Sequence, residues 1–238
     1  MKSLVVVPAY NEGQNIRQVL VALPEASVTF GVLVIDDCST DNTADVVAEL
    51  GIPQIRLPCN LGYARAVQTG LRYAVNHEYD AVVLIDADGQ HNPNVIPSML
   101  EPLKRGEADL TVGSRFVQGG SYRAPFGRAI GIRLFSHLAS FLLKQKVTDT
   151  SSGCKAMHIG VARALIASHF VDFHAEALVY VTRLGYGVRE VPITVGNRAQ
   201  GSSMYSPLSF VTYPLQTILL MLVAMWEASQ HRSEEFHR

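Results

Sequence analysis

The amino-acid sequence predicts an α/β fold in which helices flank a mostly parallel central sheet. Two observations carry this prediction: short β-branched runs alternate with helical segments through the first half of the 238 residues, and the connections between them are short. Such alternation favours parallel strands joined by right-handed crossovers. With 48% hydrophobic and 17% charged residues and no break in composition, the chain can form one domain with a sizeable core.

The first half contains five strand-like runs. Continuous apolar segments such as Leu4 to Val7 are typical of strands that are buried on both faces. Between them, apolar residues recur with helical spacing, Ser39 or Thr40 can cap a helix, and Pro93 suits a helix start. The predicted strands cover 4–7, 32–35, 55–57, 81–85 and 110–112, and the predicted helices cover 13–23, 41–50, about 62–75 and a segment opened by Pro93.

The second half is less regular. We expect helices at 127–143, near 160–168 and at 174–184, a loop at 149–155, and an extended segment at 188–195. Residues 207–226 are strongly apolar and approach the length of a bilayer span. Polar residues and Pro214 interrupt their first half, which favours a helix lying on a membrane or packed on a partner over a true span or a core helix. We therefore divide the chain into a domain at 1–205 and an apolar helix with a polar tail at 206–238.

Polar residues cluster directly after four of the predicted strands, at 8–12, 36–37, 86–88 and 113–115. In open parallel sheets, ligands bind at the carboxyl ends of the strands, so these clusters are expected along one edge. Asp86 and Asp88 flank one small residue, a pattern that suits Mg²⁺ bound together with substrate phosphates, although a solvated turn explains it equally simply.

The other clusters leave similar choices open. Asp37 either accepts hydrogen bonds from a base or ribose or caps a helix, and Asn11-Glu12 either caps the next helix or contacts a nucleotide. Arg115 is either a surface arginine or a phosphate ligand, for which a guanidinium group is well suited.

Taken in order, the motifs resemble those of inverting family 2 glycosyltransferases with the GT-A fold, which is Rossmann-like. The motifs are Pro-Ala-Tyr-Asn-Glu (8–12), Asp-Asp-Cys-Ser-Thr-Asp (36–41), Asn-Leu-Gly (60–62), Asp-Ala-Asp-Gly-Gln-His (86–91), Gly-Ser-Arg (113–115), Asp-Thr-Ser-Ser-Gly (149–153), Glu-Val-Pro-Ile (190–193), Arg198 and Gly-Ser-Ser (201–203). The downstream motifs look like the branch of dolichyl-phosphate mannose synthases and polyprenyl-phosphate glycosyltransferases. The resemblance covers roughly residues 3–205.

The resemblance implies a role for each matching position. The nucleotide pocket would be lined by Pro8, Tyr10, Glu12, Asp37 and Ser203. The metal ion, Mg²⁺ or Mn²⁺, would be held with the donor diphosphate by Asp86, Asp88 and Gln90. The donor or acceptor phosphates would be contacted by Arg115, Arg128 and Arg198. Asp88 and the three arginines would thus carry catalysis. Two departures affect the acceptor side: Met204 stands where a basic residue is frequent, and Cys154 stands where an aromatic residue is usual.

The implied activity is transfer of a hexose from a GDP- or UDP-hexose to a polyprenyl (dolichyl or undecaprenyl) phosphate. One alternative is transfer to a sugar hydroxyl, which needs a carboxylate base such as Asp149 or Glu176. A third hypothesis is a non-catalytic protein that binds nucleotide sugars. The Gln-x-x-Arg-Trp motif that is usual in processive polysaccharide synthases is absent from the sequence, which disfavours that class.

Charge and cysteine content limit the expected partners and location. The 20 Lys and Arg residues nearly balance 21 Asp and Glu residues, so nothing favours nucleic acid as a partner. The three cysteines lie far apart and no export signal is visible, which suits a reducing cytoplasm. Together with a lipid-linked acceptor, this predicts a cytoplasmic protein at the inner face of the membrane, with a homodimer through 207–226 as a further expectation.

Overall fold

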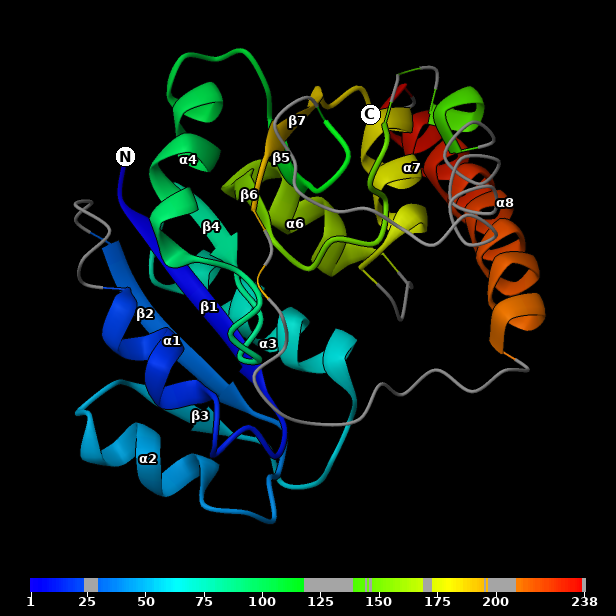
Figure 1. Ribbon diagram of the computed structural model, residues 1–238. Coiled ribbons are helices and arrows are strands. Elements are labelled where there is room, and N and C mark those ends of the chain that lie inside the picture. Colours follow the sequence, from blue (N-terminus) through cyan, green and yellow to red (C-terminus); the bar gives the residue numbers. More distant parts are fainter. Residues whose placement is uncertain are drawn as a thin grey trace.

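The computed structural model describes residues 1–23, 30–117, 139–143, 145, 147–168, 173–194, 196 and 209–236, with side chains at 216–231 of the final helix. Helices cover both faces of one seven-stranded sheet, and a long helix lies at the flank of the molecule (Figure 1). The predicted α/β class with a mostly parallel sheet is confirmed.

The strands are β1 (Ser3–Ala9), β2 (Phe30–Asp36), β3 (Gln54–Arg56), β4 (Ala81–Leu84), β5 (Leu110–Ser114), β6 (Lys155–His158) and β7 (Val188–Pro192). The helices are α1 (Ile16–Ala22), α2 (Thr43–Glu49), α3 (Tyr63–Asn76), η1 (Pro93–Val95), α4 (Ile96–Lys104), α6 (Ile159–Ala167), α7 (Ala175–Arg183) and α8 (Ser209–Phe236). The predicted elements of the first half all appear, with ends shifted by a few residues. Of the helix expected at 127–143, residues 139–143 are helical, and the remainder lies outside the described residues.

The strand order in the sheet is β3-β2-β1-β4-β6-β5-β7. Strands β1 to β5 and β7 run in one direction, whereas β6 is antiparallel to its neighbours β4 and β5. The sequence analysis placed Lys155 in a loop and missed β6. A four-residue strand that begins with a lysine has no alternating or β-branched pattern, so only its position between two buried strands identifies it.

Alternate residues of the strands face two separate apolar layers. Val5 and Val7 pack with α1, α2 and α4, whereas Leu4 and Val6 pack with α3, α6 and α7 on the other side (Figure 1). This alternation is the expected consequence of a side-chain period of two in a strand. The sheet is therefore held as a three-layer sandwich.

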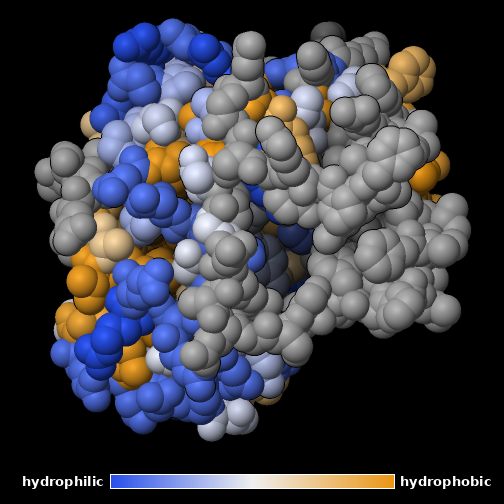
Figure 2. Space-filling model, in the orientation of Figure 1, coloured by the Kyte–Doolittle hydropathy of each residue, from blue (hydrophilic) through white to orange (hydrophobic). Residues whose placement is uncertain are grey.

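Helix α8 packs on α7 and joins the core through one face. Met221, Ala224 and Ala228 are buried in the same apolar cluster as Tyr180 of α7. Figure 2 shows hydrophobic side chains at the right-hand margin, where α8 lies in Figure 1. No helix within the described residues is long and apolar enough to cross a membrane.

Candidate active site

The four polar clusters lie at one edge of the sheet because β1, β2, β4 and β5 all end there. Hydrogen bonds tie two of these clusters to neighbouring loops. The Asn11 N–H donates to Ser39 Oγ at 3.0 Å, and the Ser114 and Thr148 hydroxyl groups lie 3.0 Å apart. The predicted gathering of polar residues at this edge is thus observed for all four strands.

Asp37 fixes the start of α3. Its two carboxylate oxygens accept the backbone N–H groups of Leu61 and Gly62, each at 2.8 Å, and its side chain is only 3% exposed. Gly62 has φ +88°, a left-handed conformation that glycine adopts without strain, and it is the N-cap of α3. Asp37 therefore holds the two residues that precede α3 and does not cap the adjacent α2. Its expected contact with a nucleotide stays a prediction.

The loop after β1 is tied to the loop after β2. Asn11 Oδ1 accepts the Thr40 N–H at 2.8 Å, and the Glu12 N–H donates to Thr43 Oγ1 at 2.8 Å. Glu12 Oε2 accepts from the Asn15 side chain at 2.7 Å. Pro8 is buried in β1, whereas Tyr10 is 45% exposed at the edge of the sheet. Among these residues, Tyr10 offers the most accessible ring.

The Asp86-Ala87-Asp88 segment forms a tight turn beyond β4. Asp88 Oδ1 accepts the Gln90 N–H at 3.0 Å, and Gly89 has φ +76°. The Gln90 carbonyl accepts the Gly196 N–H at 2.9 Å, which links this turn to the chain beyond β7. Asp86, Asp88 and Gln90 are all partly exposed, so their oxygen atoms lie at the surface of the site.

Asp86 lies next to the buried imidazole of His91. His91 is 6% exposed, and its Nε2 lies 3.6 Å from Asp86 Oδ2. Burial raises the pKa of Asp86, but the hydrogen bond and charge of His91 and the charges of Lys155 and His174 outweigh burial and hold the pKa below its usual value. The Asp86 carboxylate is therefore ionised at neutral pH.

Arg115 is fixed by Asp149. Arg115 Nε donates to Asp149 Oδ2 at 2.7 Å and Nη2 donates to Oδ1 at 2.8 Å, and the Arg115 N–H adds a third bond. Asp149 is 1% exposed, whereas 26% of the Arg115 side chain remains exposed. Burial raises the pKa of Asp149, but the hydrogen bonds and charge of Arg115 lower it further than burial raises it. This bidentate geometry holds the guanidinium group at the site edge.

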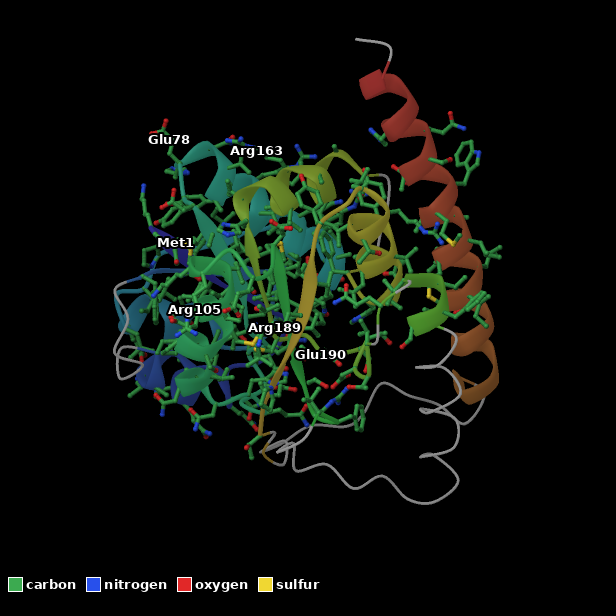
Figure 3. The ribbon with its side chains drawn as sticks, turned by 90° about the horizontal axis from the view of Figure 1, so that it is seen from above. Met1, Glu78, Arg105, Arg163, Arg189 and Glu190 are labelled. Carbon is green, nitrogen blue, oxygen red and sulfur yellow. The ribbon has the colours of Figure 1, made fainter. Side chains whose placement is uncertain are left out.

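Glu190 of β7 holds the loop that carries Asp149. Its Oε1 accepts the backbone N–H groups of Thr148 at 2.9 Å and Asp149 at 2.8 Å, and it also binds the Thr148 hydroxyl. Figure 3 labels Glu190 on β7 next to Arg189, which instead forms an ion pair with Glu107. A chain of contacts thus runs from β7 through the loop to Arg115.

Lys155 places a buried amine in the site. It opens β6, is 3% exposed, and donates through Nζ to the Ser152 carbonyl. Burial lowers the pKa of Lys155, and the nearby carboxylates of Asp86, Asp149 and Glu176 oppose that shift. Glu176 is 1% exposed in the first turn of α7, where its Oε1 accepts the His174 N–H at 3.1 Å. The charges of three carboxylates from three segments therefore act on the pKa of one lysine.

The structure accounts for part of the predicted site. Pro8, Tyr10, Glu12, Asp37, Asp86, Asp88, Gln90 and Arg115 lie along the same edge of the sheet, whereas Arg128, Arg198 and Ser203 lie outside the described residues. The sequence analysis gave no role to Lys155, His174 or Glu190. The only sequence signal for Glu190 was its motif, and the burial of Lys155 depends on β6, which was not predicted.

The sequence profile of Glycosyl transferase family 2 matches residues 4–166, which include all but the last part of this site. The chain belongs to glycosyltransferase family 2. It is 30% identical over 242 residues to the undecaprenyl-phosphate mannosyltransferase of Micrococcus luteus, covering 98% of this chain and 99% of that protein. It is 29% identical over 216 residues to the polyprenol monophosphomannose synthase of Mycolicibacterium smegmatis, covering 86% and 81%.

Solved structures agree on the fold. Glucosyl-3-phosphoglycerate synthase of Mycobacterium tuberculosis bound to phosphoglyceric acid aligns with a TM-score of 0.71 at 22% identity, covering 94% of this chain and 80% of that one. The same enzyme bound to Mn²⁺, UDP-glucose and phosphoglyceric acid aligns with a TM-score of 0.66 at 22% identity, covering 94% and 79%. This family 2 glycosyltransferase therefore has the GT-A fold that its motifs predicted.

The site of this glycosyltransferase is rich in oxygen ligands. Within the described residues, no three His, Cys, Asp or Glu side chains form a complete set of metal ligands. Asp86 and Asp88 nevertheless supply two carboxylates and Gln90 an amide at the sheet edge, which is the partial set that Mg²⁺ and Mn²⁺ accept when phosphates complete it. The ionised state of Asp86 suits a divalent ion.

Proposed function

We propose that this chain transfers a hexose from a nucleotide sugar to a polyprenyl phosphate, with inversion at the anomeric carbon. The new bond joins an acceptor phosphate oxygen to that carbon, and the bond to the donor diphosphate breaks. Both polyprenyl-phosphate relatives at about 30% identity, whose alignments extend over most of the chain, support this assignment.

The observation that carries the proposal concerns the carboxylates on the acceptor side. A sugar hydroxyl acceptor needs a general base, whereas an acceptor phosphate is already an anion and needs none. Asp149 is buried with both oxygens bound to Arg115, and Glu176 is buried beside His174 and Lys155. Both candidate bases are engaged in the protein itself, which favours the phosphate acceptor over the sugar hydroxyl alternative.

In this proposal, Asp86, Asp88 and Gln90 hold a divalent cation, Mg²⁺ or Mn²⁺, with the donor diphosphate. When bound, the ion offsets the negative charge that develops on the leaving diphosphate. The turn at Gly89 and the hydrogen bond from the Gln90 backbone N–H hold the Asp88 side chain in place before any ligand arrives. Relatives of the same fold are known with Mn²⁺, which supports a metal ion here without choosing between the two.

The residues after β1 and β2 are assigned to the nucleotide. Tyr10 can stack on the base because its ring is accessible, and Pro8, Glu12 and Asp37 shape the pocket beneath it. The donor is a GDP- or UDP-hexose. Arg115, fixed by Asp149, supplies positive charge toward phosphate, and Arg128, Arg198 and Ser203 are assigned to phosphate and donor contacts on sequence grounds.

We assign the outer face of α8 to the cytoplasmic surface of the membrane. Leu219, Leu222, Val223 and Trp226 recur with helical spacing and are 44–64% exposed, on the side opposite the buried Met221. Large exposed apolar residues mark interaction surfaces, and tryptophan favours the membrane interface. Replacing Leu222 and Trp226 by serine should weaken binding to phospholipid vesicles about tenfold in a flotation assay. A variant that binds vesicles normally but loses self-association would instead assign this face to a homodimer.

The decisive experiment incubates radiolabelled GDP- and UDP-hexoses with polyprenyl phosphate and Mn²⁺ or Mg²⁺. Polyprenol, which lacks the phosphate, is the matched control. We expect a labelled lipid product from polyprenyl phosphate and none from polyprenol. Transfer only to a saccharide hydroxyl would establish the alternative acceptor, and nucleotide-sugar binding without transfer or hydrolysis would indicate a non-catalytic protein.

A further inference from the structure

Gly153 lies directly against the carboxylate of Asp86. A Cβ atom added to Gly153 would coincide with that carboxylate, at 2.6 Å from both Cγ and Oδ1. Separations under 3.0 Å do not occur for real Cβ atoms, so any side chain at this position must displace Asp86. Gly153 does not have a positive φ, so space for Asp86, rather than an unusual backbone conformation, explains the glycine.

Hydrogen bonds to Ser152 fix the backbone next to Gly153. The Ser152 carbonyl accepts a hydrogen bond from Lys155 Nζ, and Cys154 N–H donates to Ser152 Oγ at 3.3 Å. Lys155 is itself held in the sheet, because β6 places it beside Leu84 of β4 and Val112 of β5. The position of Gly153 is therefore set, through Lys155, by the pairing of β6 with β4 and β5.

His91 also approaches Asp86, and its Nε2 lies 3.6 Å from Oδ2. An imidazole and a backbone that carries no side chain thus both border the carboxylate. The backbone hydrogen bond of the turn at 86–88 runs from the Gln90 N–H to Asp88 Oδ1 and so holds Asp88 rather than Asp86. A side chain that binds a metal must be held within a fraction of an ångström, and neighbouring groups do this.

We infer that Gly153 and Lys155 are positioning residues for the metal-binding carboxylate of Asp86: Gly153 leaves the space that the carboxylate fills, and Lys155 anchors the backbone that borders this space. This inference rests on the metal site of the proposed function. It also links the acceptor-side loop at 149–153 to the metal ion, so that a change in the loop alters metal affinity without touching a ligand.

The test measures Mn²⁺ binding rather than transfer. Free Mn²⁺ is followed by electron paramagnetic resonance during titration of the full-length chain with a saturating nucleoside diphosphate. Gly153→Ala should weaken Mn²⁺ binding about 10- to 100-fold, and Lys155→Met should weaken it about tenfold. Nucleoside diphosphate affinity in the presence of a chelator should not change, and circular dichroism should report a folded protein.

Gly160→Ala is the matched control. A Cβ at Gly160 meets only the Tyr186 ring, at 3.7 Å from the hydroxyl oxygen, which is an ordinary contact in the first turn of α6. This variant should bind Mn²⁺ as the wild type does. Equal Mn²⁺ affinity of folded Gly153→Ala and wild type would overturn the inference and leave the proposed function intact, whereas a wild type that binds no Mn²⁺ would overturn both.

If Gly153→Ala does not fold, Lys155→Met decides by the same titration. A crystal structure of the wild type with Mn²⁺ and a nucleoside diphosphate provides an independent test that needs no variant. We expect Asp86 to bind the ion while its carboxylate stays in contact with Gly153. An Asp86 side chain that binds the ion only after rotating away from Gly153 would overturn the inference.

Discussion

The two halves of the site edge share one kind of bond and differ in another. Around β1 and β2, carboxylates accept hydrogen bonds from backbone N–H groups, as Asp37 does from Leu61 and Gly62. Around β5, β6 and β7, Glu190 binds backbone N–H groups in the same way, but the buried carboxylate of Asp149 also forms a bidentate ion pair with Arg115. The second half therefore adds a buried ion pair to loops that backbone hydrogen bonds already hold.

This difference assigns different tasks to the halves. A carboxylate that caps a loop fixes backbone geometry, which suits a pocket whose shape selects a nucleotide. A buried charge network fixes the direction of a guanidinium group and maintains positive charge near phosphates. We therefore expect substitutions in the first half to act on the donor and substitutions in the second to act on the acceptor and on stability.

Asp88 lies where the two halves meet, and its replacement should have the largest effect. Asp88→Ala removes a carboxylate from the metal site and one hydrogen bond to Gln90, so we expect transfer to fall by about 100-fold or more. The melting temperature should change little, because the side chain is partly exposed. Initial rates of transfer and thermal unfolding measure the two effects.

Asp45→Ala is the matched control for Asp88→Ala, since Asp45 is an exposed acid in the first turn of α2. It should keep full activity. If Asp88→Ala also keeps full activity, the metal role proposed for the segment at 86–88 is wrong.

The same difference explains what the sequence could predict. Asp86 and Asp88 follow a run of buried apolar residues, so their position at the strand end is a local property. The buried state of Lys155 is not local: it depends on β6 inserting between β4 and β5, and no periodic pattern in four residues signals that. The part of the site built by short connections was predictable, and the part built by long-range pairing was not.

The hydrogen-bond partners of site side chains were likewise hard to predict where they lie far away in the sequence. Asp37 was expected to bind a nucleotide or cap a nearby helix, and it instead binds the two residues that precede α3, more than 20 positions away along the chain. Glu190 was recognised only as part of a motif, since its partners Thr148 and Asp149 lie on another segment. A residue type shows that a hydrogen bond must form, whereas the fold decides the partner.

Asp149→Asn should be the most destabilising change in the second half. The amide cannot pair with the Arg115 guanidinium as a carboxylate does, so we expect the free energy of unfolding to fall by about 2 kcal/mol. Acceptor affinity should also fall, because Arg115 is no longer held. Urea unfolding at pH 7 and the KM for polyprenyl phosphate measure these losses, and an unchanged KM would separate Arg115 from the acceptor.

The pH dependence of the free energy of unfolding should reveal the Arg115–Asp149 ion pair. The folded pKa of Asp149 is lower than its unfolded value of about 4, so the pair stabilises the protein above that value. This stabilisation is lost as the pH falls below about 4 toward the folded pKa. In that range the wild type should lose stability more steeply than Asp149→Asn, as measured by urea unfolding at a series of pH values. Parallel curves would show that the ion pair does not contribute.

Glu190 and Arg189 are neighbours on β7 and allow a direct comparison (Figure 3). Glu190→Ala leaves the Thr148 and Asp149 N–H groups without their acceptor, so we expect a loss of about 1–2 kcal/mol in the free energy of unfolding. Arg189→Ala breaks an exposed ion pair with Glu107, and we expect less than about 0.5 kcal/mol. Chemical denaturation measures both, and equal losses would contradict the role of Glu190 in holding the loop.

Among the replaced carboxylates that hold the site loops, Asp37→Asn should have the smallest effect and the clearest direction. Asparagine keeps the shape but has one acceptor oxygen, so one of the Leu61 and Gly62 N–H groups loses its partner at a cost of about 1 kcal/mol. The start of α3 should loosen, and the KM for the nucleotide sugar should rise a few-fold while the KM for polyprenyl phosphate stays constant. Steady-state kinetics with each substrate varied in turn measure this split. A rise in the acceptor KM instead would mean that the capped loops serve both substrates, and the division of tasks between the two halves would fail.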